Sequence, residues 1–256
     1  MIFCFSGTGN SRYVAQVLAC HWNDRVEMIG PVLTDSHPVF TLQPEEKVVW
    51  VFPVYSWGVP PVVVEFMRKV TLDVVNGCHH YMVCTCGDDV GLAHRQWRRI
   101  VRGRGWSLRG TFSVQMPNTY TLMKGFDVDS PDVVKDKLAV LPSRLDEVIG
   151  SIGRGFGGDD VVTGSWAWVK SRRVYPYFVR FCMSPRPFHA TGDCIGCGKC
   201  VRECPFSNVT MDSCSHPRWG SRCALCLRCY HICPQGAVQY GKSTAGKGQY
   251  ICPLEK

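Results

Sequence analysis

The sequence lacks an uninterrupted hydrophobic run that could span a membrane, and its start lacks the features of a secretory leader. The chain opens with an apolar segment, residues 1–5, which has neither the basic stretch nor the cleavage site of a signal peptide. The most apolar window, residues 48–67, is divided by Pro53, Pro60 and Pro61 into a strand, a loop and a helix. These absences predict a cytoplasmic protein without an integral membrane segment.

Nucleotide-binding loops are lacking as well, although two stretches imitate them. Residues 153–158 match G-x-G-x-x-G, but they follow an expected helix rather than a strand, and no helix is expected after them. Residues 236–243 match the pattern of a nucleoside-triphosphate loop, but no helix is expected to follow them either. Without a nicotinamide-binding domain, we expect negligible oxidation of NADH. No acidic and basic side chains are positioned as a catalytic pair, so no catalytic residue is predicted.

Cysteine, by contrast, is abundant, with 16 in a chain of 256 residues. Eight of them form two runs of the pattern Cys-x2-Cys-x2-Cys-x3-Cys-Pro, the second 29 residues after the first: Cys194, Cys197, Cys200 and Cys204, then Cys223, Cys226, Cys229 and Cys233. This spacing is the ligand pattern of bacterial two-cluster ferredoxins. Zinc is the alternative, but zinc sites usually offer cysteine pairs rather than triplets followed by a prolyl fourth ligand. The runs therefore predict two [4Fe–4S] clusters and, because thiolates need a reducing environment, a cytoplasmic location.

The fourth cysteine of each run is expected to serve the cluster of the other run. Three thiolates at a spacing of three residues wrap one face of a cubane, while the fourth lies a helical turn further on and points away. We therefore assign Cys204 to the second triplet and Cys233 to the first. Cys214 and Cys252 have no matching place in the repeat and are expected to be non-ligands.

The first strand, residues 1–5, leads into a loop that suits an anion. Its small hydroxyl side chains and glycines let backbone N–H groups close on a phosphate, and a helix beginning near Asn10 adds its positive end: the loop residues are Ser6, Gly7, Thr8, Gly9, Asn10 and Ser11. No lysine is present to reach the terminal phosphates of a nucleoside triphosphate, so a monophosphate fits better. The alternative is a polar turn that merely opens a helix.

Four further strands are expected, each followed by a helix or loop: residues 26–29, 47–54, 81–86 and 111–116. Helices are expected over residues 61–70, in the Arg-rich run 94–109, and from the cap at Ser130 to about residue 152. This alternation predicts an α/β fold with a doubly wound, five-stranded parallel sheet in the order 2-1-3-4-5. Tyr55 and Trp57 follow the third strand, at the sheet edge where α/β proteins place planar ligands.

Together, these motifs resemble a known family. S-G-T-G-N-S resembles the phosphate loop of flavodoxins, and with P-V-Y-S-W-G-V-P, M-P-N-T-Y and the two cysteine runs the chain is similar to the flavodoxin–ferredoxin fusion family of anaerobic bacteria and archaea. The resemblance implies a flavodoxin-like domain over residues 1–152, a linker over 153–188, and a small α+β two-cluster ferredoxin domain with a tail over 189–256. It also implies that FMN is held at the loop of residues 6–11 and lined by residues from three other loops: Pro53, Val54, Tyr55, Ser56, Trp57, Gly58, Thr85, Cys86, Gly87, Asp88, Asn118 and Tyr120.

Two basic stretches have more than one interpretation. In the linker, Trp166, Trp168, Tyr175 and Phe178 are expected to pack between the domains, with contact to a membrane surface as the alternative. The Arg-rich run 94–109 is expected to be a solvated helix face, with docking of an acidic redox partner as the alternative. The formal charge of +8 falls to about +2 once two clusters and a flavin phosphate are counted at about −2 each. Nucleic acid is therefore not an expected partner.

The expected function is low-potential electron transfer between the two clusters and FMN, with cytoplasmic redox proteins, such as a ferredoxin-type donor or acceptor or an oxidoreductase, as partners. The alternative is an FMN-dependent reductase of a small molecule that its own ferredoxin domain supplies with electrons. Such a reductase would need a cover over the flavin edge, which only the 117–127 loop and the 153–193 segment can supply. A non-redox scaffold is disfavoured by the intact hydroxyl loop.

Overall fold

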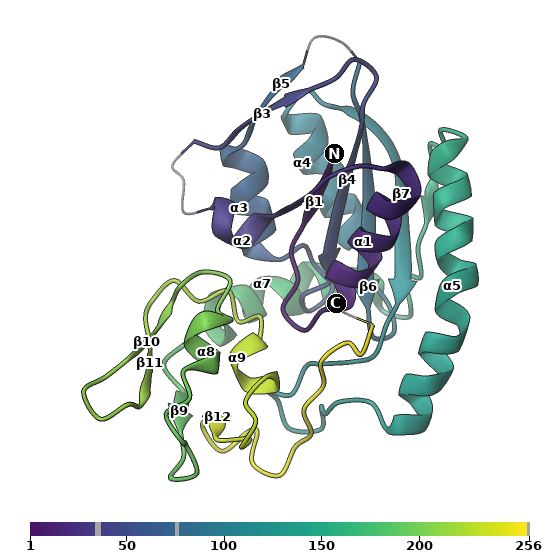
Figure 1. Ribbon diagram of the computed structural model, residues 1–256. Helices are drawn as coiled ribbons and strands as arrows, with labels where there is room; N and C mark the ends of the chain where they lie inside the picture. Colours follow the sequence, from purple (N-terminus) through teal and green to yellow (C-terminus); the bar gives the residue numbers. More distant parts are fainter. Residues whose placement is uncertain (34–36, 75–76, 255–256) are drawn as a thin grey trace.

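The computed structural model describes residues 1–33, 37–74 and 77–254, so the last two residues of the expected tail lie outside the described residues. A parallel sheet with helices on both faces occupies the first two thirds of the chain, and a smaller region of short strands and helices follows (Figure 1). A helical segment, residues 167–182, joins the two and is called the connecting helix below. It comprises α6 (Ala167–Val169), η1 (Lys170–Val174), α7 (Tyr175–Tyr177) and η2 (Phe178–Cys182).

The main sheet has six parallel strands in the order β2-β1-β4-β6-β7-β8. They are β2 (Val26–Met28), β1 (Ile2–Cys4), β4 (Lys47–Pro53), β6 (His79–Cys86), β7 (Ser107–Gln115) and β8 (Asp159–Asp160). The expected sheet of five strands is therefore wrong in its strand count and its full order. The five expected segments pair in the expected relative order, and β8 adds a sixth strand at the β7 edge by pairing with Thr111 and Phe112. Two acidic residues carry no strand pattern, so β8 could not be predicted from the amino-acid pattern.

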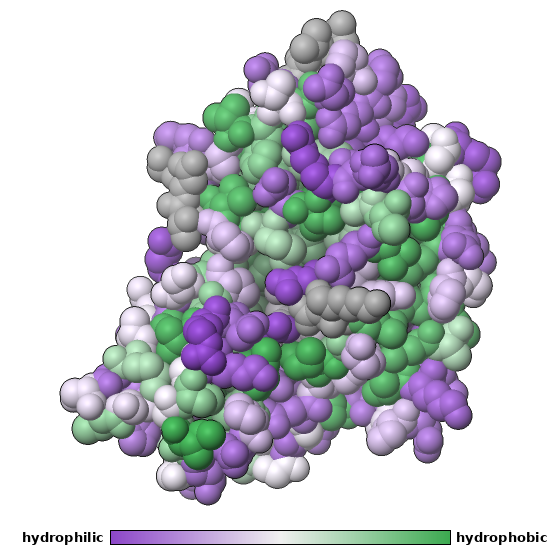
Figure 2. Space-filling view, in the orientation of Figure 1, coloured by the Kyte–Doolittle hydropathy of each residue, from purple (hydrophilic) through white to green (hydrophobic). Residues whose placement is uncertain are grey.

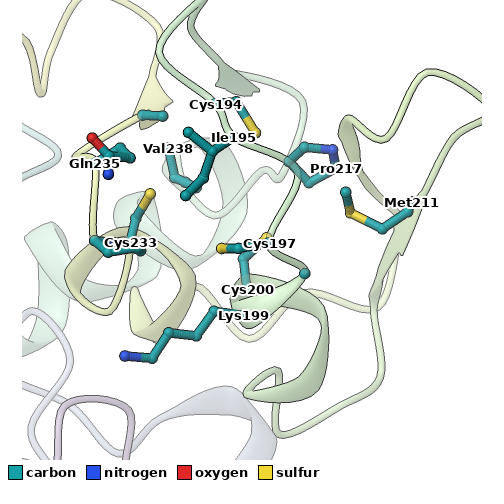
Figure 3. A pocket seen from close by; sticks show the side chains of 13 residues that line it. Cys194, Ile195, Cys197, Lys199, Cys200, Met211, Pro217, Cys233, Gln235 and Val238 are labelled. Atoms are coloured by element: carbon teal, nitrogen blue, oxygen red, sulfur yellow. The ribbon is translucent and has the colours of Figure 1, made fainter.

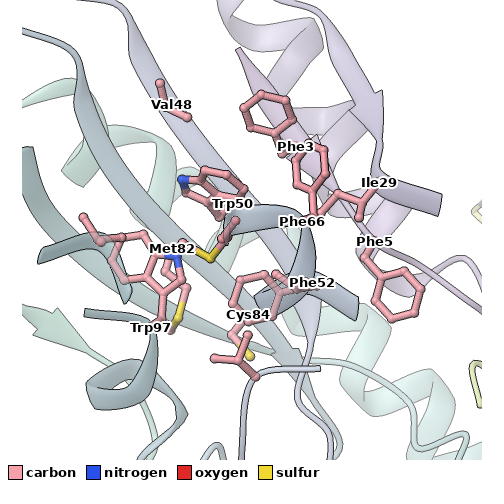
Figure 4. Packing of buried hydrophobic residues seen from close by; sticks show 14 of the residues in the cluster. Phe3, Phe5, Ile29, Val48, Trp50, Phe52, Phe66, Met82, Cys84 and Trp97 are labelled. Carbon is pink, nitrogen blue, oxygen red and sulfur yellow. The ribbon is translucent and has the colours of Figure 1, made fainter. Parts of the chain in front are cut away.

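Alternate residues of the central strands enter two apolar clusters, one on each face of the sheet. Phe3 and Trp50 pack with Phe66 of α3 (Pro61–Lys69) and Trp97 of α4 (Ala93–Gly103) (Figure 4). Their neighbours in β1 and β4 turn to the other face, under α1 (Asn10–Trp22) and α5 (Pro131–Gly153). This alternation is the two-residue period of a strand buried on both faces. Because these strands are parallel, the loops after β1, β4, β6 and β7 lie at one edge of the sheet.

The helix cap expected at Ser130 is present. The Ser130 side chain accepts from the Val133 N–H at the start of α5, with Pro131 in the first position, as expected. The helix continues through Pro142 to Gly153. Two shorter elements complete the first region: α2 (Ile29–Val32) and a separate parallel pair formed by β3 (Val39–Leu42) and β5 (Thr71–Val74).

The smaller region repeats one pattern twice. Each cysteine run leads into a one-turn helix, α8 (Lys199–Arg202) or α9 (Arg228–His231), and then a short strand, β10 (Val209–Met211) or β12 (Val238–Tyr240). The two strands pair antiparallel with β11 (Pro217–Trp219) and β9 (Phe188–Ala190), respectively. The strand β12 runs through the stretch that imitates a nucleoside-triphosphate loop, as expected from the repeat.

Hydrophilic and hydrophobic residues are intermixed over the face that Figure 2 shows, including the surface of the smaller region. In the parts of the chain that the structure describes, no helix combines the length and the apolar character needed to cross a membrane.

Candidate functional site

The first group of cysteines surrounds a cavity in the smaller region. Cys194, Cys197, Cys200 and Cys233 line it, and its free space, including the part open to solvent, is ≈ 360 Å³ (Figure 3). Burial raises the pKa of the Cys200 thiol, and the nearby Cys233, Cys194 and Cys197 raise it further. Over residues 1–33, 37–74 and 77–254, no three His, Cys, Asp or Glu side chains have the arrangement that holds one metal ion. The four thiols are instead spread around a space.

The second group brings Cys204 of the first run to the triplet of the second run. Burial raises the pKa of Cys223 to about 11 and that of Cys226 to about 12, and Cys204 acts in the same direction on both. It also raises the pKa of Cys229, where burial is again the largest cause. Cys204 and Cys223 both pack against the buried cluster that contains Cys229, which agrees with a position of Cys204 near this triplet. The raised pKa values keep the free thiols of Cys223, Cys226 and Cys229 protonated at neutral pH, whereas coordination to a metal would deprotonate them.

The second group is more sheltered than the first, and the repeat shows why. Leu225 and Leu227 stand where the first run has Gly196 and Gly198, and all four residues have positive φ, between 53° and 68°. Glycine adopts this conformation without strain, whereas leucine does not. Both leucines are buried against the second group. The second group is therefore covered by two leucine side chains whose backbone is strained, whereas the first group has unstrained glycines at the same positions.

Hydrogen-bond donors also reach the sulfur atoms of the second group. The backbone N–H of Asn208 donates to Cys204 Sγ at 3.3 Å, that of Leu225 to Cys223 Sγ at 3.4 Å, and Trp219 Nε1 to Cys229 Sγ at 3.4 Å. Donors to cluster sulfurs are among the features that set a cluster's reduction potential. The sequence offered no signal for the Trp219 contact, because it joins strand β11 to the helix α9.

The expected phosphate loop joins β1 to α1 and is tied to its neighbours. Ser11 Oγ lies 2.7 Å from Thr85 Oγ1, and Asn10 Nδ2 donates to the Pro117 carbonyl at 2.9 Å. Within the loop, the Gly9 N–H donates to Ser6 Oγ at 3.2 Å, and Gly9 has φ 97° at the position that caps α1. The start of α1 therefore contacts the end of β6 and the loop after β7.

The loop after β4 forms a tight two-residue turn beside them. Tyr55 and Gly58 exchange two backbone hydrogen bonds of 2.9 Å, and the central residues Ser56 and Trp57 have φ 44° and 62°. Such a turn normally carries Asn or Gly at these positions. Non-glycine residues held in this conformation are often found at binding sites, so the strain directs attention to Trp57. The turn follows Pro53 and Val54, and the Val54 N–H donates to the Thr85 carbonyl at 2.8 Å.

The remaining expected residues follow β6 and β7. A Cβ at Gly87 would lie 3.4 Å from Asn118, and the Asp88 carbonyl accepts from Gln115 Nε2 at 2.7 Å. The Cys86 thiol is buried, and burial raises its pKa to about 12, which agrees with a buried strand thiol rather than a nucleophile. Tyr120 lies edge-on to Phe178 of the connecting helix.

The connecting helix covers the loop after β4, which is a larger role than the sequence indicated. The Tyr175 ring lies directly against Gly58, where a Cβ would overlap it, and its hydroxyl donates to the Val59 carbonyl at 2.6 Å. Ser171 Oγ donates to the Trp57 carbonyl at 2.7 Å. Lys170 Nζ pairs with Asp89 at 2.7 Å and lies 5.0 Å from the centre of the Trp57 ring. These contacts place a roof over the proposed ring site.

The linker aromatics are expected to pack between the domains, but the contacts of two of them are with the first region. Tyr175 lies on the loop after β4, and Phe178 is buried against Tyr120. Trp166 and Trp168, however, are 78% and 58% exposed, so the expectation that they pack between the domains is wrong. Trp168 lies in the connecting helix and Trp166 directly precedes it, and the aromatic-rich sequence alone does not tell the exposed rings from the packed ones.

The second cysteine group abuts the phosphate loop. A Cβ at Gly7 would overlap the carbonyl oxygen of Cys226 and lie 3.0 Å from its carbonyl carbon. Arg228 Nη1 donates to the Gly7 carbonyl at 3.5 Å, and the same guanidinium pairs with Glu203 at 2.8 Å. Burial raises the pKa of Tyr55, and Cys226 and Cys223 raise it further. The glycine at position 7 is thus required by the approach of the cysteine loop, a contact between distant segments that a local sequence pattern does not reveal.

Comparison with known proteins bears on the smaller region. Residues 189–210 and residues 220–240 each match the family described as a 4Fe-4S binding domain. Each stretch contains one of the two cysteine runs, so this part of the chain carries two iron–sulfur binding sequences of ferredoxin type. A comparison with the curated proteins finds no match.

Two solved structures align with about half of the chain. One is a putative flavoprotein from Bacteroides uniformis, with a TM-score of 0.34 and 15% identity over 54% of this chain and 96% of that one. The other is the Trp repressor binding protein from Bacillus subtilis, with a TM-score of 0.35 and 12% identity over 57% of this chain and 96% of that one. Similarity at this level carries no conclusion about fold or ligand.

Proposed function

We propose that this chain is an electron-transfer protein in which two [4Fe–4S] clusters, bound by residues 189–256, exchange electrons with FMN, bound by residues 1–152. The observation that carries the proposal is the approach of the Cys226 backbone to Gly7 in the phosphate loop. It places one cysteine group beside the loops that the resemblance assigns to the flavin. When bound, each cluster supplies one-electron chemistry and the flavin supplies one- and two-electron chemistry.

The donor chemistry of the N-terminal loops fits a flavin phosphate. The Thr8 hydroxyl and the backbone N–H groups at the start of α1 are the groups that would bind it, and no acidic residue lies in the first turn of that helix to oppose it. Tyr55 and Trp57, at the carboxyl end of β4, would border the ring.

The two cysteine groups support different roles. The second group, sheltered by Leu225 and Leu227, lies next to Tyr55 and the phosphate loop. The first group lies in a cavity whose lining residues all belong to residues 194–238, and Cys197 and Ile195 are exposed. We therefore assign the second cluster as the inner centre, next to the flavin. The first is the outer centre, where a ferredoxin-type partner in the cytoplasm would dock.

Composition and phosphate recognition test the cofactor set. Anaerobically prepared protein should contain about eight iron, eight sulfide and one FMN per chain, as expected for two cubanes and one phosphate loop. Thr8→Ala should weaken FMN binding and leave riboflavin binding nearly unchanged, because riboflavin has no phosphate. Stoichiometric zinc, or no flavin after anaerobic reconstitution, would refute the proposal.

The roof over the loop after β4 favours a second candidate, an FMN-dependent reductase of a small molecule. A carrier that exchanges electrons through its flavin needs an open ring edge, whereas a reductase needs a covered pocket, and Tyr175 and Ser171 supply a cover. The two are distinguished by following the reduced protein under anaerobic conditions. The carrier stays reduced until an oxidised ferredoxin is added, whereas the reductase is reoxidised rapidly and saturably by a small organic acceptor alone.

A further inference from the structure

The stretch around the connecting helix has a charge composition unlike that of the rest of the chain. Residues 161–192 contain five Lys or Arg residues and no Asp or Glu, whereas the whole chain has 29 basic and 21 acidic residues. The same stretch carries four large aromatic side chains that are more than half exposed. Besides Trp166 and Trp168, these are Tyr177 and Phe181, with 62% and 63% exposed.

One side of the connecting helix is fixed to the molecule. The loop after β4 contacts Ser171 and Tyr175, and the 117–127 loop contacts Phe178. Lys170 forms an ion pair with Asp89. The aromatic side chains that remain exposed are thus presented by a helix that cannot turn to bury them. Exposed aromatic residues held in this way indicate an interaction surface.

Basic groups accompany these exposed rings. The Arg173 guanidinium lies 5.9 Å from the centre of the Trp168 ring, and that of Arg180 lies 5.4 Å from the Phe181 ring. Arg172, next to Arg173, is exposed as well. Aromatic rings beside arginines on one side of a helix are the composition of helices that lie in the interface of a membrane.

The helix α4 extends the basic character of this part of the molecule. It packs alongside the connecting helix, since Gln96 Nε2 lies 3.3 Å from the Tyr175 hydroxyl and the Leu92 N–H donates to Ser171 Oγ at 2.7 Å. Three of its arginines are exposed: Arg95, Arg99 and Arg102. The Arg-rich run of the sequence analysis therefore lies next to the aromatic-rich one.

We propose that the exposed side of the connecting helix binds the surface of a membrane that contains anionic phospholipid. Charge complementarity favours this occupant. The surface of a protein partner usually carries both acidic and basic groups, and residues 161–192 have no acidic side chain that could pair with the basic ones. The shape of the surface also favours a membrane. The rings project outward, whereas the residues that dominate binding between proteins cluster in well-packed pockets. The helix would lie on the surface without crossing it, and the electron-transfer proposal does not depend on it.

Sedimentation with vesicles tests the proposal on the cofactor-loaded protein. The probes are vesicles of phosphatidylcholine alone and of phosphatidylcholine mixed with phosphatidylglycerol. We expect binding to the mixed vesicles, little to the neutral ones, and weaker binding as salt is raised. Equal binding to both, or binding to neither, overturns the proposal.

Paired variants locate the surface. Arg172→Gln with Arg173→Gln should weaken binding about thirtyfold, which corresponds to about 2 kcal/mol at about 1 kcal/mol per basic residue. The matched control, Lys124→Gln with Lys135→Gln, removes the same charge from exposed positions elsewhere and should change binding less than about threefold. Equal losses in the two pairs would show that only net charge matters and would overturn the assignment.

The aromatic contribution is tested by Trp166→Ala with Trp168→Ala, which should weaken vesicle binding by about tenfold or more. Both side chains are exposed, so the cluster and flavin absorbance should be unchanged, and this readout separates a binding defect from misfolding. Light scattering and binding to an acidic ferredoxin complete the experiment. If this pair abolishes self-association, or ferredoxin binding, of a protein that does not bind vesicles, the surface belongs to a second copy or to a protein partner, and the membrane proposal is wrong.

Discussion

Replacement of Gly7 by alanine tests the contact on which the electron-transfer proposal depends. The added methyl group would overlap the Cys226 carbonyl oxygen and lie 3.0 Å from both the carbonyl carbon and the Cβ of the same residue. Ordinary van der Waals contact begins at 3.4 Å. The clash is with backbone rather than with the end of a flexible side chain, so one of the two loops has to move by roughly 1 Å.

The expected cost follows from that movement. Overpacking of this kind destabilises a protein by about 1–3 kcal/mol, and here the displaced residue is a cluster ligand. We therefore expect Gly7→Ala to lower the free energy of unfolding by about 2 kcal/mol and to release iron from the inner cluster faster than from the outer one. Anaerobic chemical denaturation and the loss of iron to a chelator measure the two effects.

Gly103→Ala is the matched control, because Gly103 ends α4 and a Cβ there has nothing within 4 Å. Alanine is favoured over glycine in a helix by up to about 1 kcal/mol, so this variant should be as stable as the parent or slightly more stable. If Gly7→Ala keeps both clusters and its unfolding free energy stays within about 0.5 kcal/mol of the parent, the cysteine loop does not dock on the phosphate loop.

Three further predictions concern single side chains. Cys204→Ala should deplete the inner cluster and spare the outer one, as measured by iron content and electron paramagnetic resonance, whereas Cys214→Ala should change neither; loss of the outer cluster instead would contradict cross-ligation. Trp57→Ala should weaken FMN binding by up to about tenfold, because a ring contact contributes about 0.5–1.5 kcal/mol, while Trp168→Ala should leave it unchanged in a fluorescence titration. Burial lowers the pKa of His80 to about 3, so the unfolded chain binds a proton that the folded one does not, and stability falls as pH drops below about 6.5. Between pH 7 and pH 5 the loss should be about 2 kcal/mol, and His80→Gln, which keeps an acceptor for the Trp50 N–H, should remove this part of the pH dependence; an unchanged slope in denaturation curves would show that His80 is not the cause.

The sequence predicts those parts of the fold that depend on local patterns. The strands β1, β4, β6 and β7 are visible as short, mainly apolar stretches, β-branched in β4, because they are buried on both faces. The two iron–sulfur sequences are visible because ligand spacing is fixed by the geometry of the cluster. Both kinds of signal are contained in a few consecutive residues.

What the sequence could not predict depends on contacts between distant segments. The close approach of Gly7 to Cys226 brings together residues 219 positions apart. A glycine in a loop can be required for many reasons, so its presence does not indicate this contact. The same holds for Tyr175, whose ring lies on Gly58 while Trp168, seven residues earlier, is exposed. Two turns of irregular helix separate them, so an expected helical period does not assign their sides.

The repeat itself makes the two clusters unequal, and this inequality is open to a direct test. Leu225 occupies the position of Gly196 with φ 53°, where leucine is strained, and its side chain is buried beside the second group. A cluster with four thiolates gains negative charge on reduction, and burial away from water disfavours that gain. Shelter by Leu225 should therefore hold the inner cluster at a lower potential than exposure to water would allow.

Leu225→Gly removes that shelter and at the same time relieves the backbone, so the loop keeps its conformation. We expect the potential of the inner cluster to rise in an anaerobic redox titration, while that of the outer cluster stays the same. Val140→Ala, a truncation of an exposed residue of α5 outside both cysteine groups, should change neither potential measurably. If Leu225→Gly left the inner potential unchanged, shelter would not set it, and the difference between the centres would have to come from the hydrogen bonds that Trp219 and the Leu225 N–H donate to sulfur. A fall in that potential would show that the reasoning from burial has the wrong sign.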